Sequence, residues 1–156
     1  MNTYIGSALN QIEIALKTTI EMVETIEEAD LQQRPDDNKR SIGELLEHIA
    51  VICKADLLIS NGATQKEMDE YYSSVALLNM QDIKNAIADN YKTLKDIYMN
   101  LTEIELQERT TSYWGVTYSR YEWLLEIVAH IYHHRAQLHT LLVYCCGKDL
   151  NISLFE

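Results

Sequence analysis

Proline is nearly absent from this sequence, and its scarcity is the feature that most constrains the fold. Pro35 is the only proline among 156 residues, and there are only five glycines. Both residue types interrupt helices, whereas the abundant Leu, Ile, Ala, Glu and Lys favour them. Because 47% of the residues are hydrophobic, the chain can bury a sizeable core. The sequence therefore predicts an all-α fold, and we expect residues 1–156 to form a single domain.

Four long segments carry apolar residues at the three- and four-residue spacing that is typical of amphipathic helices. Ser41 and Ser119 each open an S-x-x-E sequence, in which the hydroxyl and the carboxylate satisfy free N–H groups at a helix start. Four such helices predict a four-helix bundle. The helices are expected over about residues 2–28, 41–61, 79–101 and 119–146.

The connections between these helices differ in length and composition. Residues 63–78 are long enough to cross one end of a bundle, with a turn of helix expected near residues 66–71. The segment TSYWGVTYS at residues 111–119 is rich in aromatic and hydroxyl residues and predicts a loop or a short hairpin. Gly147 is placed to end the last helix.

The charge and the cysteine content limit the possible binding partners and the cellular compartment of the protein. The net charge is −11 at pH 7 without a basic cluster, which argues against nucleic acids and acidic membrane surfaces as partners. The sequence has no recognisable signal peptide and no apolar stretch of about 18 residues that would span a bilayer. The number of cysteines is odd, and two of the three are adjacent: Cys53, Cys145 and Cys146. Such a set is poorly suited to disulfide pairing and predicts free thiols in a reducing cytoplasm.

Four of the five histidines lie within residues 130–139, on the last predicted helix. His130 and His134 are one helical turn apart and project from the same face, a spacing that suits two imidazoles on one ion. The fifth histidine, His48, flanks the apolar stripe of the second helix. If these two helices are neighbours, the three imidazoles can converge, whereas His133 and His139 point elsewhere.

Three neutral imidazoles would leave open coordination positions, as catalytic metal sites do. Zinc, nickel and other first-row metals all suit such ligands, so ligand type alone does not choose among them. Histidines hydrogen-bonded within the core are the alternative. The zincin motif H-E-x-x-H is excluded because Ile131 follows His130, and Ile127 and Leu45 exclude the Glu-x-x-His motif of di-iron bundles.

Two segments resemble the histidine motifs of the DinB/YfiT-like superfamily. SIGELLEHIA at residues 41–50, preceded by Arg34-Pro35, resembles the first motif. HIYHHRAQ at residues 130–137 resembles the second, H-x-x-x-H-R-G-Q, with Ala136 where glycine is common. The resemblance implies an up-down-down-up bundle, frequent homodimers, and one nickel or zinc ion on His48, His130 and His134.

The superfamily includes bacillithiol- and mycothiol-dependent transferases and isomerases. The resemblance therefore implies a metal-dependent transferase that conjugates a low-molecular-weight thiol to a small electrophilic substrate. A metal-dependent hydrolase and a non-enzymatic metal- or ligand-binding bundle are the alternatives, and no catalytic base can be assigned from the sequence.

Several further side chains lie near the predicted ligands. Glu44 and Glu126 stand one turn from them, and we favour capping or solvated roles over contact with the imidazoles. Gln137 is expected to reach the groove, and Arg135 to pair with a carboxylate elsewhere. The aromatic residues of the loop and the following helix either line a substrate mouth or pack in the core, and packing is favoured: Tyr113, Trp114, Tyr118 and Trp123.

Overall fold

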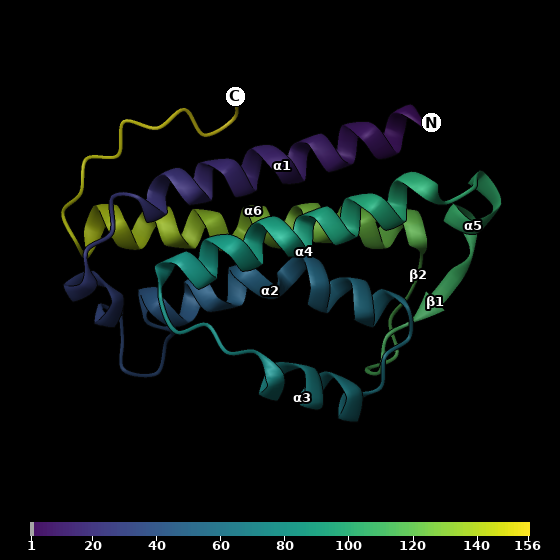
Figure 1. Cartoon of the computed structure of the whole chain (residues 1–156), viewed down its shortest axis with the longest axis horizontal. Helices are drawn as coiled ribbons and strands as arrows, with labels where there is room; N and C mark the ends of the chain where they lie inside the picture. Colours follow the sequence, from purple (N-terminus) through teal and green to yellow (C-terminus); the bar gives the residue numbers. More distant parts are fainter. Residues whose placement is uncertain (1) are drawn as a thin grey trace.

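The computed structural model describes residues 2–156 and is mostly helical, with four long helices and a small hairpin (Figure 1). In chain order the elements are α1 (Thr3–Val23), the 3-10 helix η1 (Glu28–Gln32), α2 (Ile42–Ser60), α3 (Gln65–Ser74), α4 (Met80–Asn100), α5 (Glu103–Gln107), β1 (Arg109–Thr111), β2 (Thr117–Ser119) and α6 (Arg120–Tyr144). The predicted all-α class is confirmed.

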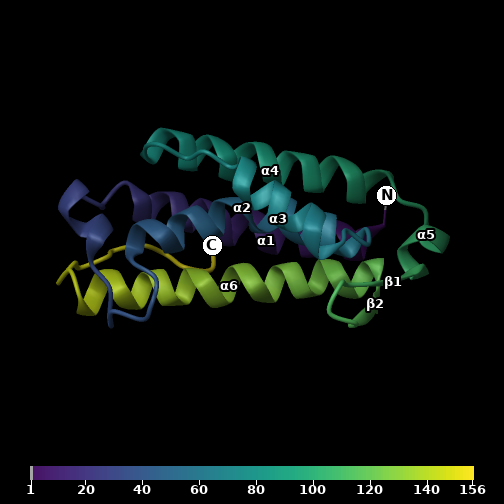
Figure 2. The same cartoon turned by 90° about the horizontal axis from the view of Figure 1, so that it is seen from below.

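The four long helices lie side by side, and their directions follow the predicted connectivity. Helices α1 and α6 run one way along the molecule, and α2 and α4 run the other way (Figures 1 and 2). Helix α1 packs against α4 and α6, and α2 packs against the same two helices. The segment that contains α3 carries the chain back along α2, so that α4 can start at the same end as α2 (Figure 1).

Reciprocal capping boxes fix the starts of both helices that carry the candidate ligands. The Ser41 hydroxyl accepts a hydrogen bond from the Glu44 N–H at 3.2 Å, and the Glu44 carboxylate accepts one from the Ser41 N–H at 2.7 Å. Ser119 and Glu122 form the same pair of bonds at the start of α6. Both predicted helix starts are confirmed, and Glu44 is a capping residue as expected.

The elements between the long helices differ from the prediction in three places. Helix α1 ends at Val23 rather than Glu28, because Glu27 and Asp30 form a separate capping box that starts η1. Helix α3 has ten residues where a single turn was expected, and α5 was not predicted. Of the two alternatives for residues 111–119, the hairpin is correct, since Thr111 pairs with Thr117 between antiparallel strands.

The expected role of Arg135 is wrong. Its guanidinium is buried between α1 and the C-terminal segment, where it donates to the Thr18 hydroxyl and the Leu154 carbonyl instead of a carboxylate. It also lies over the rings of Tyr132 and Phe155, at 4.5 and 5.1 Å from their centroids. The last residues therefore fold back over the bundle, contact α6 through Leu154 and Phe155, and pack against the main core.

The main core lies between the four long helices, and a smaller apolar cluster lies under α3 and the hairpin. Within residues 2–156, no helix is both long and apolar enough to cross a membrane. The assignment of the whole chain to one domain stays a prediction.

Candidate metal centre

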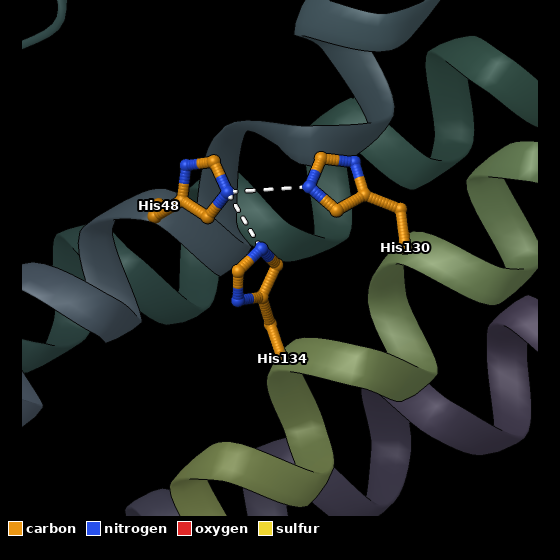
Figure 3. Close-up of side chains that lie close together, drawn as sticks. All are labelled: His48, His130 and His134. Carbon is orange, nitrogen blue, oxygen red and sulfur yellow. Dashed lines mark hydrogen bonds between the residues drawn. The ribbon is translucent and has the colours of Figure 1, made fainter.

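Three histidines from two helices point toward one another (Figure 3). His48 projects from α2, and His130 and His134 project from successive turns of α6. The Nε2 atom of His48 lies 3.4 Å from Nε2 of His130 and 3.1 Å from Nε2 of His134. The structure thus brings together the three residues that the sequence placed on two separate stretches of chain.

Two neighbouring side chains orient the imidazoles of α6. The Asp56 carboxylate accepts a hydrogen bond from His130 Nδ1 at 2.7 Å, and the Gln137 amide oxygen accepts one from His134 Nδ1 at 2.8 Å. The amide nitrogen of Gln137 faces His133 at 3.2 Å, which leaves its oxygen for His134. Because each neutral ring then carries its proton on Nδ1, the lone pairs of both Nε2 atoms point toward His48.

This arrangement fits a divalent cation better than it fits hydrogen bonds alone. The lone pairs on Nε2 of His130 and His134 both face His48 Nε2, which can donate only one proton to them. A cation between the rings would instead satisfy all three nitrogens. Two nitrogens that lie about 2.0 Å from zinc at a tetrahedral angle are about 3.3 Å apart. The observed separations of 3.4 and 3.1 Å agree with that value. The histidine cluster can therefore hold a divalent metal ion.

Burial and nearby charges shift the pKa values of the three imidazoles in different directions. Burial, followed by the positive charge of Arg40, lowers the pKa of His48 to about 3. Burial also lowers the pKa of His134. Burial acts in the same sense on His130, but the hydrogen bond and charge of Asp56 outweigh it and raise the pKa of that ring. His48 and His134 are thus held neutral, as metal binding requires.

A cavity of about 270 Å³ opens beside His130 and has an aromatic and acidic wall. Tyr113, Trp114 and Trp123 contribute the aromatic surface, and Asp56 and Glu126 contribute the acidic one. Trp123 is almost fully buried and also belongs to the small apolar cluster. It therefore both packs in the core and lines a cavity, the two roles that the sequence left open. Tyr118 packs edge-on against Trp123 and does not line this cavity.

Glu126 is less solvated than the sequence suggested. Its carboxylate, that of Asp56 and a ring nitrogen of His130 lie within 4.8 Å of one another. Burial, with the negative charge of Asp56, raises the pKa of Glu126 to about 7. The preference for a capping or solvated role is therefore wrong for Glu126, because α6 places this half-buried carboxylate beside Asp56 of α2.

A second cavity, of about 500 Å³, lies on the other side of the cluster and includes His134 in its wall. Lys39 and Arg40 line it from the loop before α2, and Gln137 lines it from α6. The expectation that Gln137 reaches a groove is confirmed. The histidine cluster thus stands between two cavities whose walls carry opposite charges.

The remaining histidines and the cysteines are not part of the three-histidine group. His133 is exposed, contacts Gln137 and packs edge-on against the ring of His134, with the ring centroids 4.9 Å apart. All three cysteines are free thiols. Cys53 is buried, and burial raises its pKa to about 12, which makes the thiol unreactive.

Asp56 is the residue at this site that the sequence analysis missed. Its carboxylate is 9% exposed and forms the closest contact to a candidate ligand. A signal was present, because Asp56 is a single charge inside the apolar run ADLLI on α2. A charge in such a run is seldom buried without a partner, so a buried partner on another element was to be expected.

Comparisons with known proteins show the family to which the chain belongs. The sequence model of the DinB superfamily matches residues 11–138. The crystal structure of a protein assigned to the DinB family from Exiguobacterium sibiricum 255-15 is similar over 99% of both chains, with 32% identity and a TM-score of 0.89.

Two more distant structures share the fold. A DinB-like protein from Bacillus subtilis is 15% identical with a TM-score of 0.68, over 99% of this chain and 100% of the other. A DinB-like protein from Bacillus cereus ATCC 10987 is 19% identical with a TM-score of 0.64, over 96% of this chain and 95% of the other. No curated protein sequence matches the chain. The family match and the similarity over nearly the whole chain show that this protein belongs to the DinB superfamily.

Proposed function

We propose that this protein is a divalent-metal-dependent enzyme that transfers a low-molecular-weight thiol to a small electrophile. The observation that carries the proposal is the convergence of three imidazole Nε2 atoms between two cavities. His48, His130 and His134 would hold the ion, and the family resemblance favours nickel or zinc. Three protein ligands leave coordination positions for a reactant, which a structural site would not.

A divalent cation bound at this position lowers the pKa of a thiol or water molecule that reaches it. The other tasks belong to side chains of this protein. Asp56 and Gln137 hold the rings of His130 and His134 in one tautomer and one orientation. The aromatic wall beside His130 offers an apolar surface to the electrophile and keeps water from that side.

A metal-dependent hydrolase is the second candidate, and Glu126 would serve as a base in either reaction. A carboxylate whose pKa is about 7 can accept a proton from a nucleophile at neutral pH. In a hydrolase Glu126 would take that proton from water, and in a transferase it would take it from the thiol. The residue therefore supports proton transfer in both reactions, and the assay has to separate them.

Metal content tests the ligand set directly. Protein purified without chelators should contain about one nickel or zinc ion per chain, and His130→Ala should lose it, since two imidazoles hold an ion much less well than three. His139→Ala is the matched control, because that histidine lies on the same helix outside the cluster. Full metal retention by His130→Ala would contradict the ligand assignment.

Activity assays on the metal-loaded protein separate the candidate functions. A transferase should consume thiol in the presence of a bimane or dinitrobenzene electrophile, and metal-depleted protein should not. Turnover of esters or amides without thiol would identify the hydrolase instead. Reversible metal binding with neither activity would identify a non-enzymatic metal-binding bundle and would refute the enzyme proposal.

The compartment and assembly are also proposals. Three free cysteines support a reducing cytoplasm, where thiols stay unpaired. The family resemblance supports a homodimer. Light scattering on a size-exclusion column measures the mass in solution, and a mass of 18.1 kDa, that of one chain, would contradict the dimer.

A further inference from the structure

The larger cavity beside the histidine cluster has two adjacent cations in its wall. Lys39 and Arg40 lie at the end of the loop before α2, and both are exposed to the cavity and to solvent. On the opposite wall α6 contributes His133, Gln137 and Thr140, which all offer polar atoms. The apolar floor is made of Pro35, Leu45, Ala136 and Leu141. The cavity thus offers both cationic groups and apolar surface to a ligand.

The two cations stand out against the charge of the whole protein. The chain has 24 acidic and 13 basic side chains, yet neither cation forms an ion pair with a carboxylate within residues 2–156. Asp36 and Asp37 belong to the same loop, but neither lines the cavity. Most of the other Lys and Arg side chains at the surface do pair with acidic partners, as Lys84 does with Glu24 at 2.8 Å.

The loop that presents these cations is held in place by its own contacts. The Arg34 guanidinium donates to the Lys39 carbonyl at 2.9 Å and lies 3.5 Å from the Glu44 carboxylate at the start of α2. The Asp36 carboxylate accepts a hydrogen bond from the Asn38 N–H at 2.8 Å. Such contacts reduce the entropy lost when a ligand binds, because the loop is already ordered.

The two cavities differ in the charge that they would accept. Asp56 and Glu126 would repel an anion from the smaller, aromatic cavity. Lys39 and Arg40 would attract an anion to the larger one, whose volume of about 500 Å³ is within the usual range for small-molecule sites. His134 lies in the wall of this cavity, so a ligand held there reaches the histidine cluster.

We propose that the larger cavity is an anion subsite, in which Lys39 and Arg40 bind a carboxylate or phosphate group of a small-molecule substrate. That the ligand is a substrate rests on the proposed function, whereas binding of the anion depends only on this cavity. The anionic group would anchor one end of the molecule, and the other end would extend over the apolar floor toward His134. The reaction partner would then occupy the aromatic cavity on the far side of the cluster.

Binding of simple probes to the zinc-loaded protein tests the subsite without an activity assay. Ligand-observed NMR would compare succinate and methyl phosphate with succinamide, which matches succinate in shape but lacks charge. We expect the two anions to bind more tightly than succinamide. Added salt should weaken the binding of the anions, because ions in solution screen exposed charges. The double variant Lys39→Gln/Arg40→Gln should raise the Kd of the anions by about tenfold or more, because it removes both charge-assisted contacts.

Lys17→Gln is the matched control, because Lys17 is an exposed cation on α1 outside both cavities. It should leave all three Kd values unchanged. Equal affinity for succinate and succinamide, or anion affinity that the double variant does not change, would overturn the subsite. If the binding results overturn the subsite but thiol is still consumed in the transferase assay, only the subsite proposal fails. If the anions bind as expected but no turnover occurs, only the proposed function fails.

Discussion

Replacing Asp56 by asparagine should weaken metal binding by about 10- to 100-fold, although Asp56 is not among the proposed ligands. The Asp56 carboxylate accepts the Nδ1 proton of His130 at 2.7 Å, and only 9% of its side chain is exposed. Asparagine keeps an oxygen that can accept this proton but removes the negative charge. The ring of His130 then becomes a weaker base, and the nearby cation loses a favourable charge.

The magnitude follows from the strength of this hydrogen bond. A hydrogen bond to a charged group is worth about 1.5–3 kcal/mol, and each 1.4 kcal/mol changes an equilibrium constant about tenfold. Asp56→Ala should weaken binding further than Asp56→Asn, because it leaves the His130 Nδ1 proton without this acceptor. The order of affinity should therefore be wild type, then Asp56→Asn, then Asp56→Ala.

Competition of the protein with a chromophoric chelator for zinc measures these affinities at neutral pH. Asp89→Asn is the control for loss of one negative charge, because Asp89 is exposed on α4 and distant in sequence from the cluster. Its Kd for zinc should equal that of the wild type. A Kd for Asp56→Asn within about twofold of the wild type would refute the role of the carboxylate in holding His130.

Three further predictions concern stability, each measured by chemical denaturation of the metal-free protein. Folding raises the pKa of Glu126 from 4.5 to about 7, so its negative charge increasingly destabilises the fold as the pH rises from 4.5 through 7. Glu126→Gln should therefore add about 1–2 kcal/mol to the free energy of unfolding at alkaline pH, a value discounted for partial exposure. The same substitution should change that free energy almost not at all near the unfolded pKa of 4.5. The Glu27 N–H, followed by Lys148, lowers the pKa of Asp30, so this group stabilises the fold above its unfolded pKa of 3.8. Asp30→Asn should therefore cost stability at neutral pH, and the difference from the wild type should shrink as the pH falls below 3.8 through the lowered pKa. Arg135→Met should cost about 1–3 kcal/mol, because it leaves the Leu154 carbonyl without its donor, and an unchanged midpoint would contradict a structural role for this guanidinium.

Local patterns predicted the long helices and the placement of His130 and His134 on one helix face, whereas the convergence of His48 on them was implied by the family resemblance. Apolar spacing and the S-x-x-E boxes at Ser41 and Ser119 determine where α2 and α6 start. Thr64-x-x-Glu67 and Thr102-x-x-Glu105 form the same box and start α3 and α5, so the signal for both short helices was present and was not used.

Contacts between distant segments could not be predicted in the same way. Arg135 is buried because the C-terminal segment returns to it, and no spacing on α6 indicates where residues 147–156 go. Asp56 and His130 are 74 residues apart, and their contact depends on how α2 and α6 pack. Helical periodicity gives the face on which a residue lies, whereas the partner on the next helix follows from packing.

Anomalous X-ray diffraction from crystals of the zinc-loaded protein tests the central claim most directly, because it locates the ion itself. We predict one ion per chain at about 2.0–2.1 Å from the Nε2 atoms of His48, His130 and His134, with the hydrogen bond from His130 Nδ1 to Asp56 intact. The nearby group of Asp56, Glu126 and His130 is the competing position. An ion bound there through carboxylate oxygens, with the three Nε2 atoms left without metal, would contradict the account.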